Sequence, residues 1–108
     1  MEELLNVANL VANKLNSRFD GPPEQRQILQ ALKVQEEAGE LAQAVIGALG
    51  VNPNKGHSHT WDDVRAEACG TAFTALVLLH MLGGDPAWFL AEHLHTIRTK
   101  AEGWEATA

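Results

Sequence analysis

An all-α fold is predicted for this chain by two observations. Apolar residues recur at intervals of three and four in four segments, and stretches containing glycine or proline separate those segments. No segment shows the strict alternation of apolar and polar residues that is typical of a β-strand. The 108 residues contain no internal repeat or linker, so we expect a single helical domain over residues 1–108.

The first two helices are predicted over residues 2–15 and 24–49. Asp20-Gly21-Pro22-Pro23 ends the first, and proline is tolerated in the first turn of the second. Gly50 lies just past the end of the second helix. The apolar stripe of the first consists of Leu4, Leu5, Ala8, Val11, Ala12 and Leu15, and that of the second of Ile28, Leu29, Leu32, Leu41, Ala42, Val45 and Ile46.

The other two helices are predicted over residues 61–82 and 86–100. Thr60 is a suitable N-cap for the third, and Asp62 and Asp63 in its first turn favour the helix dipole. Gly83-Gly84 ends this helix, and Asp85-Pro86 opens the fourth. The residues of the fourth helix that we expect to face inward are Trp88, Phe89, Leu90, Leu94 and Ile97.

The charge balance argues against one class of partner. Eight basic and 14 acidic residues give a formal charge of −6, whereas a protein that binds duplex nucleic acid needs a basic surface to neutralise phosphates. A small phosphorylated ligand remains compatible with this charge, because a bound metal can invert it locally.

Location and assembly are predicted from equally simple features. The single cysteine, Cys69, cannot form an internal disulfide, and the acidic N-terminus lacks the pattern of a signal peptide. The longest apolar stretch is too short to span a bilayer. We therefore expect a cytoplasmic protein with no membrane segment. A domain this small buries only a limited fraction of its surface on folding, so we expect self-association to bury more.

Two groups of carboxylates are the most informative feature of the sequence. Glu37 and Glu40 are three residues apart on the second helix, so their Cβ atoms lie about 5–6 Å apart on one face. Glu67 offers another carboxylate from the third helix. Both groups flank apolar runs, and a hard divalent cation with oxygen ligands would offset their repulsion. A solvated acidic helix face is the alternative. Gly39 costs the helix about 1 kcal/mol relative to alanine, which a close approach of other atoms would explain.

Residues 33–44 resemble the first signature of the MazG-like, all-α nucleoside triphosphate pyrophosphatases. That signature is Glu-x-x-Glu on one helix, followed on the next by Glu-x-x-Asp. Glu37-x-x-Glu40 matches the first half, and Glu67 falls at the spacing of the second. The loop 52–56 and the tail 98–104 are also similar to stretches of these proteins. The likeness covers residues 30–104.

The resemblance implies a four-helix MazG-like bundle that assembles as a homodimer or homotetramer. It implies that Glu37, Glu40 and Glu67 bind Mg²⁺, and that the substrate is a nucleoside triphosphate, hydrolysed to the monophosphate and pyrophosphate. Glu36 or Glu37 would position or deprotonate the attacking water. The candidates for substrate contacts are Lys55, Arg98, Lys100 and Trp104. The alternative for the two lysines and the arginine is that they are ordinary solvent-exposed charges.

One position departs from the signature. Gly70 stands where these proteins have the aspartate of Glu-x-x-Asp, so the fourth carboxylate is missing. Mg²⁺ keeps several waters in many sites, so three carboxylates can still hold it with lower affinity. Asp63, one turn before Glu67, is an alternative fourth ligand. A favourable interaction with the helix dipole is the preferred interpretation of this residue. The departure leaves two further functions open: a catalytically degenerate nucleotide-binding protein, or a helical protein-interaction module with an acidic face.

The remaining motifs favour structural roles. Five histidines are present, but no second Glu-x-x-His accompanies Glu92-x-x-His95, so we interpret them as structural or solvent-facing. Cys69 is predicted to be a small buried apolar residue rather than a nucleophile. Trp61 and Trp88 are predicted to lie in the core or in an interface, and Trp104 is also a candidate for stacking on a nucleobase.

Overall fold

Four helices make up the part of the chain that the structure, a computed structural model, describes, namely residues 1–104. They are α1 (Glu2–Ser17), α2 (Pro23–Leu49), α3 (Trp61–Met81) and α4 (Pro86–Glu102). The described residues contain no strand. The all-α prediction is confirmed for them, and each predicted boundary lies within two residues of the observed one.

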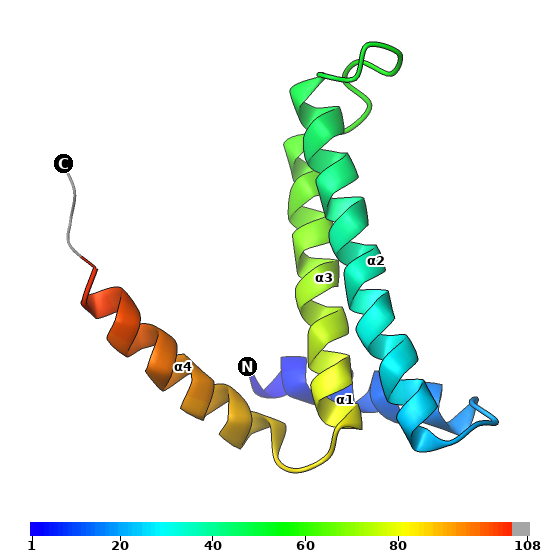
Figure 1. Cartoon of the computed structure of the whole chain (residues 1–108), viewed down its shortest axis with the longest axis vertical. Coiled ribbons are helices and arrows are strands. Elements are labelled where there is room, and N and C mark those ends of the chain that lie inside the picture. The colour runs from blue at the N-terminus through cyan, green and yellow to red at the C-terminus, as the bar shows by residue number, and fades with distance from the viewer. Residues whose placement is uncertain (105–108) are drawn as a thin grey trace.

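The α2 and α3 helices form an antiparallel hairpin, and α1 packs across α3 at its base (Figure 1). The buried core at this junction consists of Ala8, Ala12, Val77 and Met81, with Val11, Leu15, Phe73 and Leu76 packed around it. Two glutamines also join the hairpin: the Gln27 side chain donates to the Met81 carbonyl and the Gln30 side chain to the Thr74 carbonyl, each at 3.1 Å. Because Gln30 is only 3% exposed, its bond fixes the register of α2 against α3 in a dry environment.

The α4 helix leaves the hairpin through the turn at Gly83 and Gly84, whose φ angles of 85° and 78° favour glycine. It then extends to one side and makes few contacts with the other helices (Figure 1). No residue of α4 is buried. Its apolar residues were predicted to face inward, but Trp88, Phe89, Leu94 and Ile97 are all exposed. That prediction is wrong for the single chain, because α4 does not pack along the hairpin.

The described helices also bear on the membrane prediction. Among residues 1–104, no helix combines the length and the apolar character that crossing a bilayer requires.

Candidate metal centre

Three carboxylates from two helices converge near the middle of the α2–α3 hairpin. Glu37 and Glu40 come from α2 and Glu67 from α3, and one carboxylate oxygen of each lies within 4.8 Å of the others. Glu37 and Glu67 are half-buried, so water screens the cluster only partly. Oxygen ligands around Mg²⁺, each 2.0–2.1 Å from the ion, are separated by about 3–4 Å. Small side-chain rotations would therefore close these three oxygens around a divalent cation.

The negative charges of the cluster act on Glu40. The neighbouring charge of Glu37 raises the pKa of Glu40 above its ordinary value of 4.5, and partial desolvation and the charge of Glu67 add to the effect. A carboxyl group that resists ionisation in this way gains the most from a bound cation. The metal-free cluster is thus held at an electrostatic cost that a divalent ion would offset.

Lys33, one turn before the cluster, offsets part of this charge. Its ammonium group donates to Glu36 at 3.0 Å and lies 3.5 Å from Glu37. The bond to Glu36 raises the pKa of Lys33, and the charges of both glutamates contribute. Glu36 is therefore an exposed partner of the lysine, whereas Glu37 lies between the lysine and the other two carboxylates.

Gly70 borders the cluster. A Cβ atom added to it would lie 3.3 Å from a carboxylate oxygen of Glu37. Glu67 and Gly70 are three residues apart and share a face of α3, as Glu37 and Glu40 do on α2. A side chain at position 70 would therefore point at the three carboxylates, and glycine leaves the space of a fourth ligand open.

Asp63 does not add a fourth carboxylate to the cluster. Its carboxylate accepts a hydrogen bond from the Thr60 backbone N–H at 2.9 Å, and its own N–H donates to the Thr60 hydroxyl at 3.1 Å. This reciprocal pair is a capping box at the start of α3. The Thr60 backbone N–H is the main cause of a lowered pKa for Asp63. The carboxylate therefore serves the helix end, the role that the sequence favoured.

Other atoms were expected to approach the helix closely at Gly39, but they do so at Gly47. A Cβ at Gly39 would meet no atom within 4 Å, so that interpretation of the glycine is wrong, and nothing in the structure explains its presence. Gly47, two turns further along α2, is the crowded position. A Cβ there would clash with the side chains of Ser58 and His59, so only glycine lets the loop after α2 lie against the helix.

This loop and the last turns of α2 enclose a hollow. The hollow has a volume of about 230 Å³, and Lys55 lines it together with Gln43, Asn52, Ser58 and His59. Gln43 lies one turn beyond Glu40 on the same face of α2, about 4.5 Å along the helix axis. Only Lys55 of these residues was predicted as a substrate contact. The signal that was missed was the loop's Gly-His-Ser-His segment, whose close packing is set by Gly47.

The other predicted substrate contacts lie on or just after α4. Arg98 donates to Glu102 at 2.6 Å along the helix surface, and Lys100 and Trp104 are exposed. The end of α4 lies far from the middle of the hairpin (Figure 1). The structure thus places Lys55 in the loop at the end of the hairpin, in a hollow that Gln43 also lines, and does not bring Arg98, Lys100 or Trp104 to the carboxylates within one chain.

Two further expectations concern histidine and cysteine. His57 and His80 each place Nδ1 at hydrogen-bonding distance from a backbone carbonyl, Ala48 at 3.1 Å and Leu76 at 3.0 Å, which fits structural roles. Cys69 is exposed rather than buried. The prediction of a buried cysteine is therefore wrong.

Comparison of the chain with protein-family models, with curated proteins and with solved structures gives no match.

Proposed function

We propose that this protein binds Mg²⁺ through Glu37, Glu40 and Glu67 and hydrolyses a nucleoside triphosphate to the monophosphate and pyrophosphate, as its resemblance to the MazG-like pyrophosphatases implies. The observation that carries the proposal is the convergence of these three carboxylates within 4.8 Å. They are the residues that the signature assigns to the metal, and they come from separate helices. A solvated acidic face would not require the two helices to bring their carboxylates together.

The residues fit the chemistry of a phosphoanhydride substrate. When bound, Mg²⁺ neutralises phosphate charge and lowers the pKa of a coordinated water. Hydrolysis would break the P–O bond that joins the α- and β-phosphates. The oxygen of an attacking water would bond to one of these two phosphorus atoms and the bridging oxygen would stay with the other, which gives the monophosphate and pyrophosphate. Glu37 is favoured over Glu36 to accept the proton of this water, because Glu37 lies in the cluster and Glu36 is exposed and bonded to Lys33.

The proposed substrate contacts fall into two groups. Lys55 lines the hollow at the loop after α2, and it would contact a phosphate of a nucleotide bound to the same chain. Arg98, Lys100 and Trp104 lie on the α4 side of the molecule, so contacts from them would require a second copy in the proposed homo-oligomer. The residues of the hollow that offer hydrogen bonds to the sugar or base are Gln43, Asn52, Ser58 and His59.

Gly70 supports a second candidate, a protein that binds the nucleotide without hydrolysing it. Three carboxylates hold Mg²⁺ with fewer anionic oxygens than four, which weakens the site and leaves the attacking water less constrained. An interaction module with an acidic face is the third candidate. Dependence on Mg²⁺ separates the first two candidates from the third, and turnover separates the first from the second.

The test is pyrophosphate release from a panel of ribo- and deoxyribonucleoside triphosphates with Mg²⁺, for the natural chain and Gly70→Asp. Gly39→Asp is the matched control, because it adds the same charge to a helix position that borders no other atom. We expect turnover by the natural chain and faster turnover by Gly70→Asp alone. Turnover only in Gly70→Asp would identify a disarmed nucleotide-binding protein. No turnover and no Mg²⁺ binding in either would refute both nucleotide functions.

A further inference from the structure

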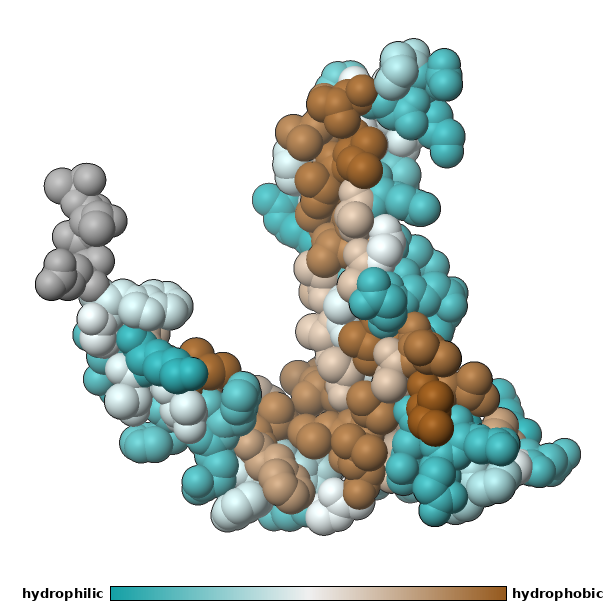
Figure 2. All heavy atoms as spheres, viewed as in Figure 1, coloured by the Kyte–Doolittle hydropathy of each residue, from teal (hydrophilic) through white to brown (hydrophobic). Residues whose placement is uncertain are grey.

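Lys33 places a basic side chain beside the three carboxylates of the candidate metal centre. Hydrophilic residues interrupt the apolar surface of the hairpin about midway along it (Figure 2). The Lys33 ammonium nitrogen lies 3.0 Å from Oε1 of Glu36 and 3.5 Å from Oε1 of Glu37. Lys33 therefore contacts one of the three proposed metal ligands, Glu37, as well as an exposed glutamate that is not one of them.

The ion pair between Lys33 and Glu37 differs from the other ion pairs within residues 1–104 in its burial. The Glu37 side chain is only 17% exposed. The carboxylate side chains of the other pairs are at least 61% exposed and belong to Glu36, Asp62 and Glu102. Exposed ion pairs are screened by water and contribute little. Because Glu37 is screened less, the ammonium group acts more strongly on the carboxylate that the metal centre uses.

The two oxygens of Glu37 face different neighbours. Oε1 is the oxygen that lies near the Lys33 ammonium group on α2. Oε2 lies 3.3 Å from the position that a Cβ atom on Gly70 of α3 would take. The carboxylate is thus held by the lysine through one oxygen and presents the other to α3, the helix from which Glu67 joins the cluster.

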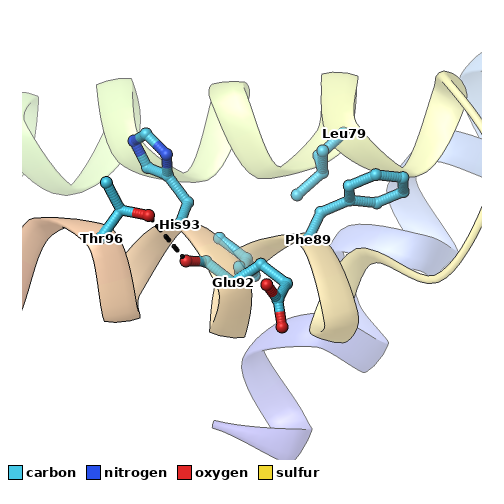
Figure 3. A pocket seen from close by; sticks show the side chains of 6 residues that line it. Leu79, Phe89, Glu92, His93 and Thr96 are labelled. Carbon is cyan, nitrogen blue, oxygen red and sulfur yellow. Dashed lines mark hydrogen bonds between the residues drawn. The ribbon is translucent and has the colours of Figure 1, made fainter.

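The carboxylate of Glu92 on α4 provides a contrast, because Glu92 forms no ion pair within residues 1–104. It borders a hollow of about 510 Å³ between α3 and α4, whose lining residues include neither lysine nor arginine. Figure 3 shows the Glu92 carboxylate pointing away from His93, the other titratable side chain of this hollow. A glutamate without a partner samples several rotamers, and ordering it costs conformational entropy. A partner that already holds the carboxylate reduces this cost.

We infer that Lys33 is a positioning residue of the metal centre. It holds Oε1 of Glu37 and thereby keeps Oε2 directed toward α3. Groups that bond to metal-ligating carboxylates in this way fix the orientation of the ligand before the ion arrives. The inference rests on the proposed Mg²⁺ site and is independent of nucleotide hydrolysis.

The sign of the effect on Mg²⁺ affinity separates positioning from simple charge. An ammonium group repels a divalent cation, so a lysine that acted only through its charge would weaken Mg²⁺ binding, and its removal would strengthen it. A lysine that positions Glu37 has the opposite effect. Its removal should weaken Mg²⁺ binding by about 10–100-fold, as the loss of other outer-shell partners does.

The test is titration of Mg²⁺ by calorimetry, without nucleotide, into the natural full chain, Lys33→Met, Lys33→Arg and Lys14→Met. Methionine keeps an unbranched side chain and favours the helix. Lys14 is exposed on α1 and forms no ion pair within residues 1–104, so Lys14→Met removes the same charge elsewhere. We expect weaker binding by Lys33→Met alone. Lys33→Arg should recover most of the affinity, because it keeps a charged donor near Glu37.

Circular dichroism checks that each variant keeps its helices. If Lys33→Met loses helix signal, Lys33→Ala replaces it, since alanine has the highest helix propensity, and should show the same weakening. Equal or tighter Mg²⁺ binding by Lys33→Met, or binding by Lys33→Arg as weak as that of Lys33→Met, would overturn the inference and leave the metal site standing. A natural chain that does not bind Mg²⁺ would refute the site itself and the inference with it.

Discussion

The α2–α3 hairpin and the α4 helix have similar helical patterns in the sequence but different surroundings in the structure. The hairpin is joined by packed side chains and by bonds from Gln27 and Gln30 to backbone carbonyls of α3. The α4 helix has no buried residue, and its charged pair, Arg98 and Glu102, is exposed to water. Both regions contain carboxylates, yet only those of the hairpin are brought together by contacts between helices.

This difference indicates that the two regions need different partners. Like charges held together in a partly dry site need a cation, whereas the same charges on a solvated helix are screened by water. An exposed apolar stripe, in contrast, needs another apolar surface. The hairpin is therefore the region in which we expect a metal, and α4 is the region in which we expect a second protein chain.

The largest expected effect is the loss of metal binding in Glu37→Gln. Removing a metal ligand should weaken Mg²⁺ binding by more than the roughly 10–100-fold that loss of an outer-shell partner costs, and any turnover should fall with it. The measurements are Mg²⁺ titration by calorimetry and pyrophosphate release. Glu92→Gln on α4 is the matched control and should bind Mg²⁺ as the natural chain does. Equal binding by the two variants would place the metal outside the hairpin cluster.

The helix boundaries of both regions could be predicted from the sequence because their signals are local. The capping residues Thr60 and Asp85 and the glycine pair at 83–84 mark helix ends through their own backbone chemistry. The convergence of Glu37 and Glu40 with Glu67 could be predicted as well, because the first two share a helix face and the resemblance supplied the third. What these signals do not encode is which face meets which neighbour.

The exposure of α4 could not be predicted for that reason. Trp88, Phe89, Leu94 and Ile97 have the spacing of a buried face, and the same spacing serves a face buried by a second chain. The positions of Gly39 and Gly47 were equally ambiguous. Both are helix-interior glycines with the same local cost, and only the path of the loop after α2 shows that Gly47 is the crowded one.

A second prediction compares these two glycines within the hairpin. Gly47→Ala should destabilise the protein by about 1–3 kcal/mol, because the new methyl group forces Ser58 and His59 outward. Gly39→Ala should stabilise it by up to about 1 kcal/mol, since alanine favours the helix and meets no other atom. Urea denaturation measures both. Opposite signs are the expected result, and a stabilising Gly47→Ala would contradict the packing of the loop against α2.

A third and smaller effect compares the caps of the two regions. Thr60 accepts from the Asp63 N–H at the start of α3, and Asp85 accepts from the Ala87 N–H at the start of α4. Thr60→Ala should reduce the free energy of unfolding by about 1 kcal/mol. At protein concentrations too low for assembly, Asp85→Ala should increase fraying of α4 and change global stability less, because α4 contributes little to the core. Hydrogen exchange of the amides in each helix measures the two effects, and equal global losses would show that α4 folds with the hairpin.

The smallest expected effect is a pH dependence that the hairpin carboxylates give to the metal-free protein. The pKa of Glu40 lies above 4.5, chiefly because of Glu37, so the folded state holds the Glu40 proton more tightly than the unfolded state does. In chelator, stability should therefore fall as pH rises from 4.5 through the raised pKa. The natural chain should lose this stability relative to Glu40→Gln, in which position 40 has no charge to gain. Saturating Mg²⁺ should reverse this pH dependence. The ion binds the ionised carboxylates, so stability should then rise with pH. Denaturation curves at several pH values measure the difference, and a difference that does not change with pH would show that the three carboxylates do not repel one another.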